Sequence, residues 1–319
     1  MRHLILGFAL VFGLVFTPAA DATPLDLHRI PADAAGVGHL DVDALRASSL
    51  MKMLEAALDA DKDDAELVKA KPIITQLEKN CSAITLWLVD VPKPATAKPA
   101  TAKSDDKSDT TGVVLFEFPG VAAANDFANS IAALAGKKMQ GGRYTITMDE
   151  KPITVAVFGN VVGLSDSVAD LDRTIAVSQG KAASLTAKQL PATMERGMFL
   201  FAVLGKGMLD DVRKAAGSTL LQTEMSSVTL NIGEIAGELR AHATATMATL
   251  DGAQKVKSVL DGLLALAALA DDAKQYASIT KNVKISISGT TTDLAFAMPT
   301  ADLVKLLINN NNPASVKIN

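Results

Sequence analysis

Three polar side chains that could hold a metal ion stand close together near the start of the chain. His39, Asp41 and Asp43 alternate with apolar residues. On a strand, all three would project from one face, which is a workable start for a carboxylate and imidazole metal site. The same residues can also form the polar face of a strand, with Asp43 capping the helix that follows. No second cluster of His, Cys or Asp supplies further ligands, so we favour this structural interpretation and predict no cofactor.

Two other motifs give weaker indications of chemistry. Gly205, Lys206 and Gly207 stand between strand-like and helix-like segments, where backbone amides could cradle an anion. The full glycine, lysine and hydroxyl spacing of a nucleotide loop is missing, so we expect a turn there. Cys81 is the only cysteine, and no histidine stands near it in a supporting motif. We expect a small packed side chain, with no intrachain disulfide and no nucleophile.

Hydrolytic chemistry lacks an assembled set of residues. Ser165 lies outside any G-x-S-x-G motif, and no triad order can be assigned to it. The remaining acids and histidines have no partner that the sequence identifies: Glu117, Glu234, Glu238, His28 and His242. We therefore predict a protein that is not an enzyme. A metal-dependent hydrolase with a site scattered around His39, Asp41 and Asp43 remains the alternative.

The composition is typical of a globular protein with an aliphatic core. The chain has 319 residues, of which 49% are hydrophobic, and a formal net charge of -4. Acidic and basic residues are interspersed, so no face carries the excess of positive charge that nucleic acids require. Aromatic residues are sparse, which argues against stacking platforms for bases. We predict no nucleic-acid partner.

The first 22 residues have the pattern of a signal peptide. Arg2 and His3 precede an apolar run from Leu4 to Phe16, and Ala20-Asp21-Ala22 forms a small-x-small cleavage motif. We predict export to the periplasm or beyond, with a mature chain that starts near Thr23. The run is short for a membrane span, and no later stretch reaches the required length, so we expect no transmembrane span after cleavage. An uncleaved anchor is the alternative.

The mature chain reads as one α+β unit that is used twice. The first unit covers residues 23–184 and the second covers residues 185–308. Each reads as strand, helix, two strands, helix, two strands, helix. Ile30-Pro31-Ala32 precedes the first strand, and Leu190-Pro191-Ala192 precedes the apolar strand from Met198 to Leu204. The order predicts two similar antiparallel-sheet units with helices packed on one face, of ferredoxin-like character and related by internal duplication. It leaves open whether the two units form one continuous sheet or two separate ones.

Two segments are predicted to lack regular structure. Residues 92–111 repeat Lys-Pro-Ala-Thr-Ala and continue with charged residues and serines, so they cannot bury enough apolar surface to offset the cost of ordering. Because a strand-like run follows at once, we interpret this insertion as a long loop between neighbouring strands, with a domain linker as the alternative. The polar tail, residues 309–319, is also expected to be disordered.

Several shorter patterns predict individual elements. Gly159 and Asn160 favour a two-residue hairpin turn, and Ser167 is placed to cap a short helix. Asp251, with Gln254, is expected to cap the longest helix, whose apolar residues predict a wide buried stripe. The segment from Leu260 to Ala270 is apolar around most of its circumference. It is therefore expected to lie between the two units or to face a groove.

The chain resembles uncharacterised exported bacterial proteins built from tandem α/β units. The resemblance is carried by the signal peptide, by the paired unit openings IPADAAGVGHLDVDAL and LPATMERGMFLFAVL, and by the late hairpin VKISISGTTTDLAFAM. It implies an exported α+β scaffold and transfers no functional residue. We predict a non-enzymatic binding or interaction protein of the cell envelope, whose partner is an envelope protein. The alternative is a carrier that holds a hydrophobic ligand in a groove near the 251–270 helix.

Overall fold

The structure is a computed structural model of the whole chain. It describes residues 24–58, 75–77, 79–89, 111–135, 142–148, 151–205, 208–209, 225–269 and 273–310. The predicted signal peptide and almost all of the 92–111 insertion lie outside these ranges, as do Lys206, Gly207 and the tail from residue 311. The predictions made for them remain predictions.

Strands and helices alternate in groups along the described chain. The strands are β1 Gly36–Asp41, β2 Ala83–Val89, β3 Thr111–Glu117, β4 Arg143–Met148, β5 Lys151–Phe158, β6 Val161–Ser165, β7 Met198–Gly205, β8 Met225–Ile235, β9 Glu238–Met247, β10 Val283–Ser288 and β11 Thr291–Pro299. The α-helices are α2 Val42–Ala47, α3 Ser49–Leu58, α5 Val121–Leu134, α6 Val168–Ser178, α8 Leu250–Leu269, α9 Ala273–Thr280 and α10 Thr300–Asn310. Two short 3-10 helices are η2 Leu27–Arg29 and η3 Ala187–Gln189.

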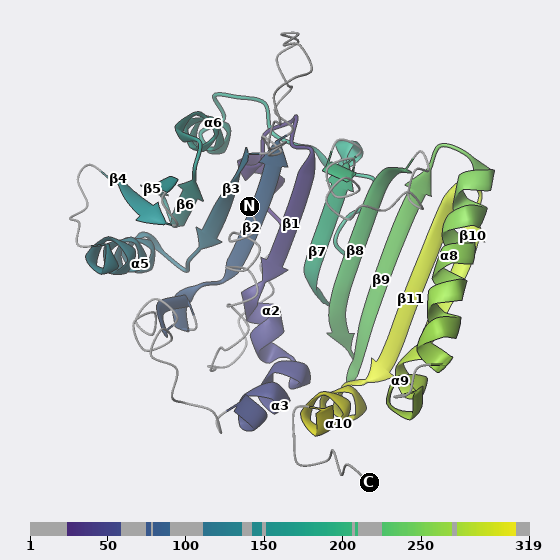
Figure 1. The fold of residues 1–319 in the computed structure, drawn as a ribbon. Helices are drawn as coiled ribbons and strands as arrows, with labels where there is room; N and C mark the ends of the chain where they lie inside the picture. The colour runs from purple at the N-terminus through teal and green to yellow at the C-terminus, as the bar shows by residue number, and fades with distance from the viewer. Residues whose placement is uncertain are drawn as a thin grey trace, which may run out of the picture.

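All eleven strands belong to one open sheet (Figure 1). Their order is β10-β11-β9-β8-β7-β1-β2-β3-β6-β5-β4, and every neighbouring pair is antiparallel. The α+β class is therefore confirmed. Strands of both predicted units, residues 23–184 and 185–308, belong to this one continuous sheet, because β1 and β7 pair side by side at its centre. The duplication and the ferredoxin-like character remain predictions.

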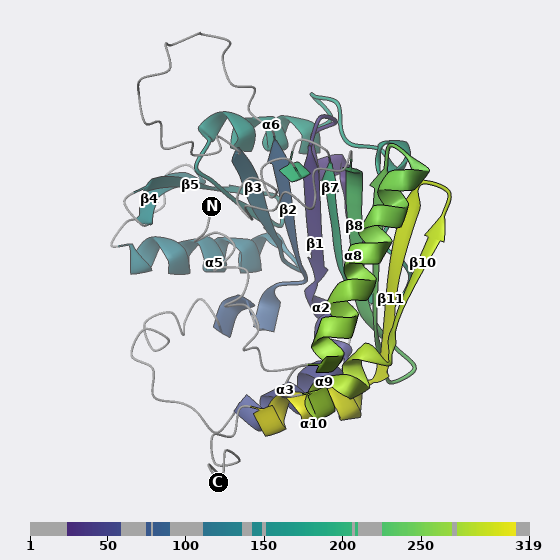
Figure 2. The same ribbon diagram turned by 45° about the vertical axis from the view of Figure 1, so that its right-hand side comes forward.

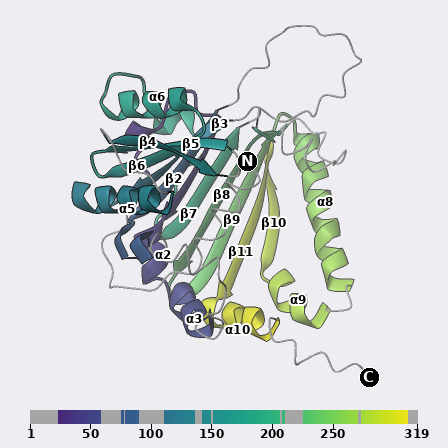
Figure 3. The same ribbon diagram turned by 60° about the vertical axis from the view of Figure 1, so that its left-hand side comes forward.

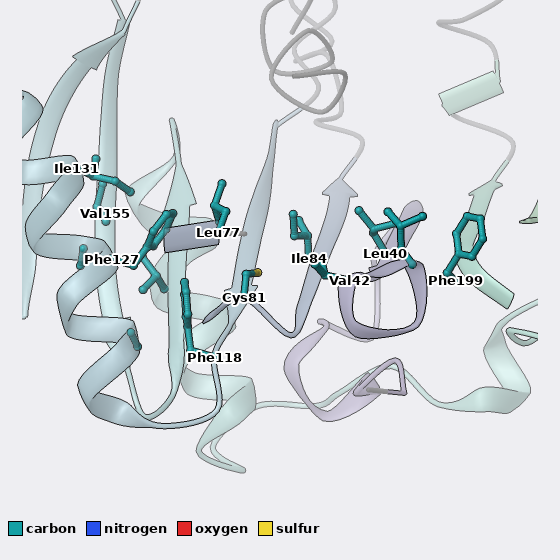
Figure 4. Packing of buried hydrophobic residues seen from close by; sticks show 14 of the residues in the cluster. Leu40, Val42, Leu77, Cys81, Ile84, Phe118, Phe127, Ile131, Val155 and Phe199 are labelled. Carbon is teal, nitrogen blue, oxygen red and sulfur yellow. The ribbon is translucent and has the colours of Figure 1, made fainter. Parts of the chain in front are cut away.

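Helices pack on both faces of the sheet, which corrects the prediction of a single helical face (Figure 2). Successive residues of β3 belong to different clusters: Val114 packs with Phe127 of α5, whereas Val113 lies in the cluster that holds Leu171 of α6. Adjacent strand residues point to opposite faces, so α5 and α6 cover opposite sides. Figure 4 shows part of the larger cluster, in which Leu40, Ile84 and Phe127 lie on the α5 side.

Local sequence signals place several turns and caps correctly. Gly159 has φ of 60° between β5 and β6, as a two-residue hairpin turn requires. The hydroxyl of Ser167 accepts a hydrogen bond from the Asp170 amide at 3.2 Å and caps α6. β2 and β3 pair directly, so the 92–111 insertion stands in the sequence between two neighbouring strands.

Three predicted helix boundaries are wrong. β1 ends one residue earlier than expected, so Asp41 and not Asp43 caps α2, by accepting a hydrogen bond from the Ala44 amide at 2.8 Å. At α8 the hydroxyl of Thr249 accepts from the Gly252 amide at 3.1 Å, so the helix begins before Asp251. α10 extends through residue 310, two residues into the tail predicted to be disordered.

Candidate functional site

The three metal-ligand candidates have separate structural roles. His39 Nδ1 lies 2.9 Å from the hydroxyl of Thr85 on the neighbouring strand β2. Asp41 is the cap of α2, and Asp43 lies inside that helix, so the three do not share one strand face as predicted. Within the described ranges, no group of three or more His, Cys, Asp or Glu side chains could hold a metal ion.

Asp43 belongs to a buried polar network centred on Arg46. Arg46 Nη1 donates to the Asp43 carboxylate at 2.5 Å, and Nη2 donates to the carbonyls of Leu77 and Cys81 at 2.9 and 2.5 Å. The network ties α2 to the residues that precede β2. Burial raises the pKa of the Cys81 thiol to about 12, which agrees with the predicted packed side chain and argues against a nucleophile.

The remaining acids and Ser165 also have partners that the sequence did not identify. Glu117 pairs with Arg29 at 2.7 Å, and Glu238 pairs with Arg240 at 2.9 Å. Glu234 accepts hydrogen bonds from the hydroxyl of Ser49 and, at 2.9 Å, from the Leu50 amide at the start of α3. Ser165 donates to the Gly112 carbonyl at 2.7 Å. Except for the Glu238–Arg240 pair, which lies within β9, each contact joins two elements of the fold.

One row of apolar side chains crosses the sheet from β2 to β10. Strand register aligns one residue from each of seven strands: Leu86, Gly38, Ala202, Leu230, Ala243, Leu294 and Ile285. We call this set the apolar row. All seven residues are half-buried, and among the residues that the structure describes none belongs to a core cluster. An aliphatic row that remains in partial contact with water is a candidate binding surface.

The same register continues beyond β2 into β3, β6 and β5, where other side chains cover the aligned residues. There Val114 and Leu164 pack against the cluster that holds α5, and Val155 is fully buried. Closer to α10, the row that contains Ile232 and Phe296 packs against that cluster too. The apolar row therefore differs from its surroundings in what packs over it, and not in composition.

Helix α8 lies on the same side of the sheet as the apolar row, beside β11 and β10 (Figures 1 and 3). The hydroxyl of Thr292 donates to the Ala253 carbonyl at 3.0 Å, and Val256 is buried against the sheet. This contact fixes only the first half of α8. The predicted sandwich between two units is therefore wrong, because α8 packs at one edge of the single sheet.

The second half of α8 is apolar on all sides and exposed. From Gly262 to Leu269 every residue is Gly, Ala or Leu. Leu263, Leu266 and Leu269 are 56%, 65% and 80% exposed, so the wide buried stripe predicted for this helix holds at Val256 but does not extend into the second half. A helix that is hydrophobic all round is normally buried, so this end of α8 is a second candidate contact surface.

The two flanks of α8 differ in polarity. Viewed from its N-terminus, a helix turns clockwise by about 100° per residue. Figure 1 shows α8 in front of the sheet at its β10 edge, and Val256 is buried against the strands. Lys257 and Asp261, which pair at 2.5 Å, lie about 100° and 140° around the helix from Val256, whereas Leu266 lies about 80° from it in the opposite sense. One flank of α8 is therefore charged and the other apolar.

A polar cluster on the opposite face contradicts another prediction. His242 was expected to stand apart from any acidic pair, but its Nδ1 lies 2.9 Å from Glu195 and its Nε2 lies 3.4 Å from Asp293. The two acids lie 47 and 51 residues from the histidine in the sequence. Only the pairing of β9 with β11 and the path of the chain before β7 bring them together, so no local motif could have revealed the cluster.

Sequence reasoning located α8 but missed the apolar row. Each of the seven strands contributes one member of the row, for example Leu230 on β8 and Leu294 on β11, yet the alignment of these members follows only from the strand order. No helix among the described residues is long and apolar enough to cross a membrane.

Comparisons with known proteins give limited information. No protein-family profile and no curated protein sequence matches the chain. Three crystal forms of the protein TP0453 are similar in structure, each at 9% sequence identity. Form I has a TM-score of 0.48 and the match covers 91% of this chain and 98% of that chain. For form III the TM-score is 0.47 and the match covers 91% of this chain and 99% of that chain. For form IV the TM-score is 0.44 and the match covers 90% of this chain and 97% of that chain. At this identity and these scores the likeness carries no argument about function.

Proposed function

We propose that the chain is an exported, non-enzymatic binding protein of the cell envelope that holds the alkyl chain of an amphiphile. The ligand lies on the apolar row, beneath the flank of α8 that carries Leu263 and Leu266. The observation that carries the proposal is the adjacency of two aliphatic surfaces, one on the sheet and one on the helix, both in partial contact with water.

The chemistry of the surface favours an alkyl chain over other apolar ligands. The apolar row contains Gly, Ala, Leu and Ile and no aromatic ring, and its strands pair on both sides except at β10. Interior strands have no open backbone edge to which a peptide strand could add. Aliphatic side chains offer dispersion contacts and exclusion of water, which is what a saturated chain can use.

Two features support a binding role without chemistry. The side chains that the sequence offered for a reaction are engaged in the fold, as with the Asp43–Arg46 pair and the Asp41 cap. Gly38, on β1 near the end of the apolar row away from α8, leaves open space: an added Cβ would meet only the Leu86 Cβ, at 3.9 Å. The missing side chain leaves room for the far end of an alkyl chain that runs along the row from α8.

The test is calorimetric titration of the mature protein with dodecanoic, tetradecanoic and hexadecanoic acid. We expect one-to-one binding whose dissociation constant falls about threefold to fourfold for each CH₂ added, because burying one CH₂ contributes about 0.8 kcal/mol. A Gly38→Leu variant fills the row on β1, at the end away from α8, and should weaken the binding of hexadecanoic acid more than that of dodecanoic acid while keeping the fold, because the position has room for a side chain. Binding that is equally strong in this variant would contradict the proposal.

A protein partner on the outer side of α8 is a second candidate, favoured by Leu269, which is 80% exposed. Leu269→Gln and Leu266→Gln form a matched pair that separates the two functions. If the ligand lies between helix and sheet, only the change at Leu266 weakens fatty-acid binding. If the envelope partner is a protein on the outer side, neither Gly38→Leu nor the fatty acids affect its binding, and Leu269→Gln abolishes it.

A further inference from the structure

The polar cluster around His242 lies on the sheet face opposite to α8 and is not used by the proposed function. It joins three parts of the chain: His242 on β9, Asp293 on β11, and Glu195 in the segment that leads into β7. Glu195 is attached at two points, since its amide also donates to Oδ1 of buried Asn231 on β8 at 3.2 Å. We call residues 190–197 the connecting segment, because it follows η3 and leads into β7.

We infer that His242 attaches the connecting segment to the sheet in a proton-dependent way. The attachment is strong when the His242 ring is protonated and weaker when the ring is neutral. The inference follows from which atoms surround the two ring nitrogens. A carboxylate oxygen faces Nδ1 at 2.9 Å, and another faces Nε2 at 3.4 Å. Both carboxylates can only accept hydrogen bonds.

A neutral ring cannot satisfy both acids. It carries one N–H, so one nitrogen presents a lone pair to a carboxylate oxygen. The hydroxyl of Thr244 does not resolve the conflict at Nε2, although it lies 3.4 Å away, because its proton is donated to Asp293 at 2.9 Å. An imidazolium donates from both nitrogens and carries the charge that both acids complement. Protonation therefore strengthens the attachment, and loss of the proton as pH rises weakens it.

Other charged groups near the cluster do not change this preference for the protonated His242 ring. On the same face of β9, Arg240 is engaged with Glu238 at 2.9 Å. Lys284 on β10 lies opposite Ala295 of β11, which in turn lies opposite His242. Lys284 is therefore two strands from His242, at about 10 Å. β8 contributes Thr229 and Asn231 to this face, and neither titrates. Arg196 is exposed and adjoins Glu195 in the connecting segment.

The test is amide hydrogen exchange of the intact protein, read by NMR at the Glu195 amide, which reports the attachment directly. Histidine side chains change charge between about pH 5 and 8, so rates are compared at about pH 5.5 and 7.5 and corrected for intrinsic exchange. We expect protection to be at least about threefold higher at the lower pH, as two partly exposed ion pairs allow. His242→Gln should abolish this dependence, whereas His28→Gln, in a different part of the chain, should leave it unchanged.

A second variant keeps the inference testable if the change at His242 disturbs the fold. Glu195→Gln retains the size of the side chain and the backbone amide but removes one of the two charges. It should reduce the pH dependence at the residue 195 amide and leave thermal stability nearly unchanged. Equal protection of the wild-type amide at both pH values would overturn the inference, as would a pH dependence that persists in His242→Gln.

Discussion

At the scale of single residues, the polar side chains that suggested chemistry serve to connect elements of the fold. Arg46 is the clearest case, because its guanidinium pairs with Asp43 and donates to two carbonyls within the interior. Sequence analysis found Asp43 through its spacing but could not find Arg46 as its partner. The carbonyl acceptors come from residues 77 and 81, which lie 31 and 35 residues away in the chain.

Replacing Arg46 should destabilise the protein strongly. In Arg46→Met the Asp43 carboxylate loses the Arg46 guanidinium while it remains buried, and breaking one side of such a pair costs about 3 kcal/mol. Urea unfolding followed by circular dichroism measures the change. Lys255→Met is the matched control, because Lys255 pairs with Asp251 at the exposed surface of α8, and the expected loss is under about 0.5 kcal/mol. Similar losses in the two variants would contradict a buried network.

Cys81 should not react with thiol reagents in the folded protein. Its pKa is raised from 9.0 to about 12 by burial, so at about pH 8 only about one thiol in 10⁴ is ionised. A disulfide-exchange reagent should label it in urea and not without urea. The same shift contributes stability that is fully present below the unfolded value of 9.0 and is lost as pH rises toward 12. Rapid labelling of the native protein near pH 8 would contradict this burial.

At the scale of elements, local signals identify most strands and helices, and tertiary neighbours decide what each one buries. The turn at Gly159 and the cap at Ser167 depend on nearby residues and were predicted correctly. The burial of α8 was not predicted correctly, because Leu263 and Leu266 have the spacing of a core stripe whether or not a neighbour covers them. Periodicity identifies the apolar side of a helix but not what packs against it.

Two glycine substitutions should have opposite effects on stability. A Cβ at Gly233 on β8 would lie 2.4 Å from the Gly197 carbonyl oxygen and from the Met198 Cα, both backbone atoms. Gly233→Ala should therefore cost about 2 kcal/mol or more. Gly262 in α8 has no atom within 4 Å of an added Cβ, so Gly262→Ala should stabilise the protein by about 0.5 to 1 kcal/mol through helix propensity. Thermal unfolding of both variants checks the contrast, and a shift of the same sign in both would contradict it.

At the scale of the whole molecule, a single sheet creates surfaces that the separate halves could not. β1 and β7 lie more than 150 residues apart in the chain, and their pairing aligns Gly38 with Ala202 in the apolar row. The α+β class followed from the order of elements, but the strand order did not, since long-range pairing leaves no local pattern. The apolar row and the His242 cluster both depend on that order and occupy opposite faces.

The most direct test of the central claim is photo-crosslinking of the mature protein with a hexadecanoic acid that carries a diazirine on its alkyl chain, followed by peptide mapping. We expect crosslinks to β8, β9 and β11, around Leu230, Ala243 and Leu294, and to α8 at Leu266, with fewer of these crosslinks in Gly38→Leu. Crosslinks confined to the outer side of α8 at Leu269, or crosslinks unchanged in Gly38→Leu, would contradict it.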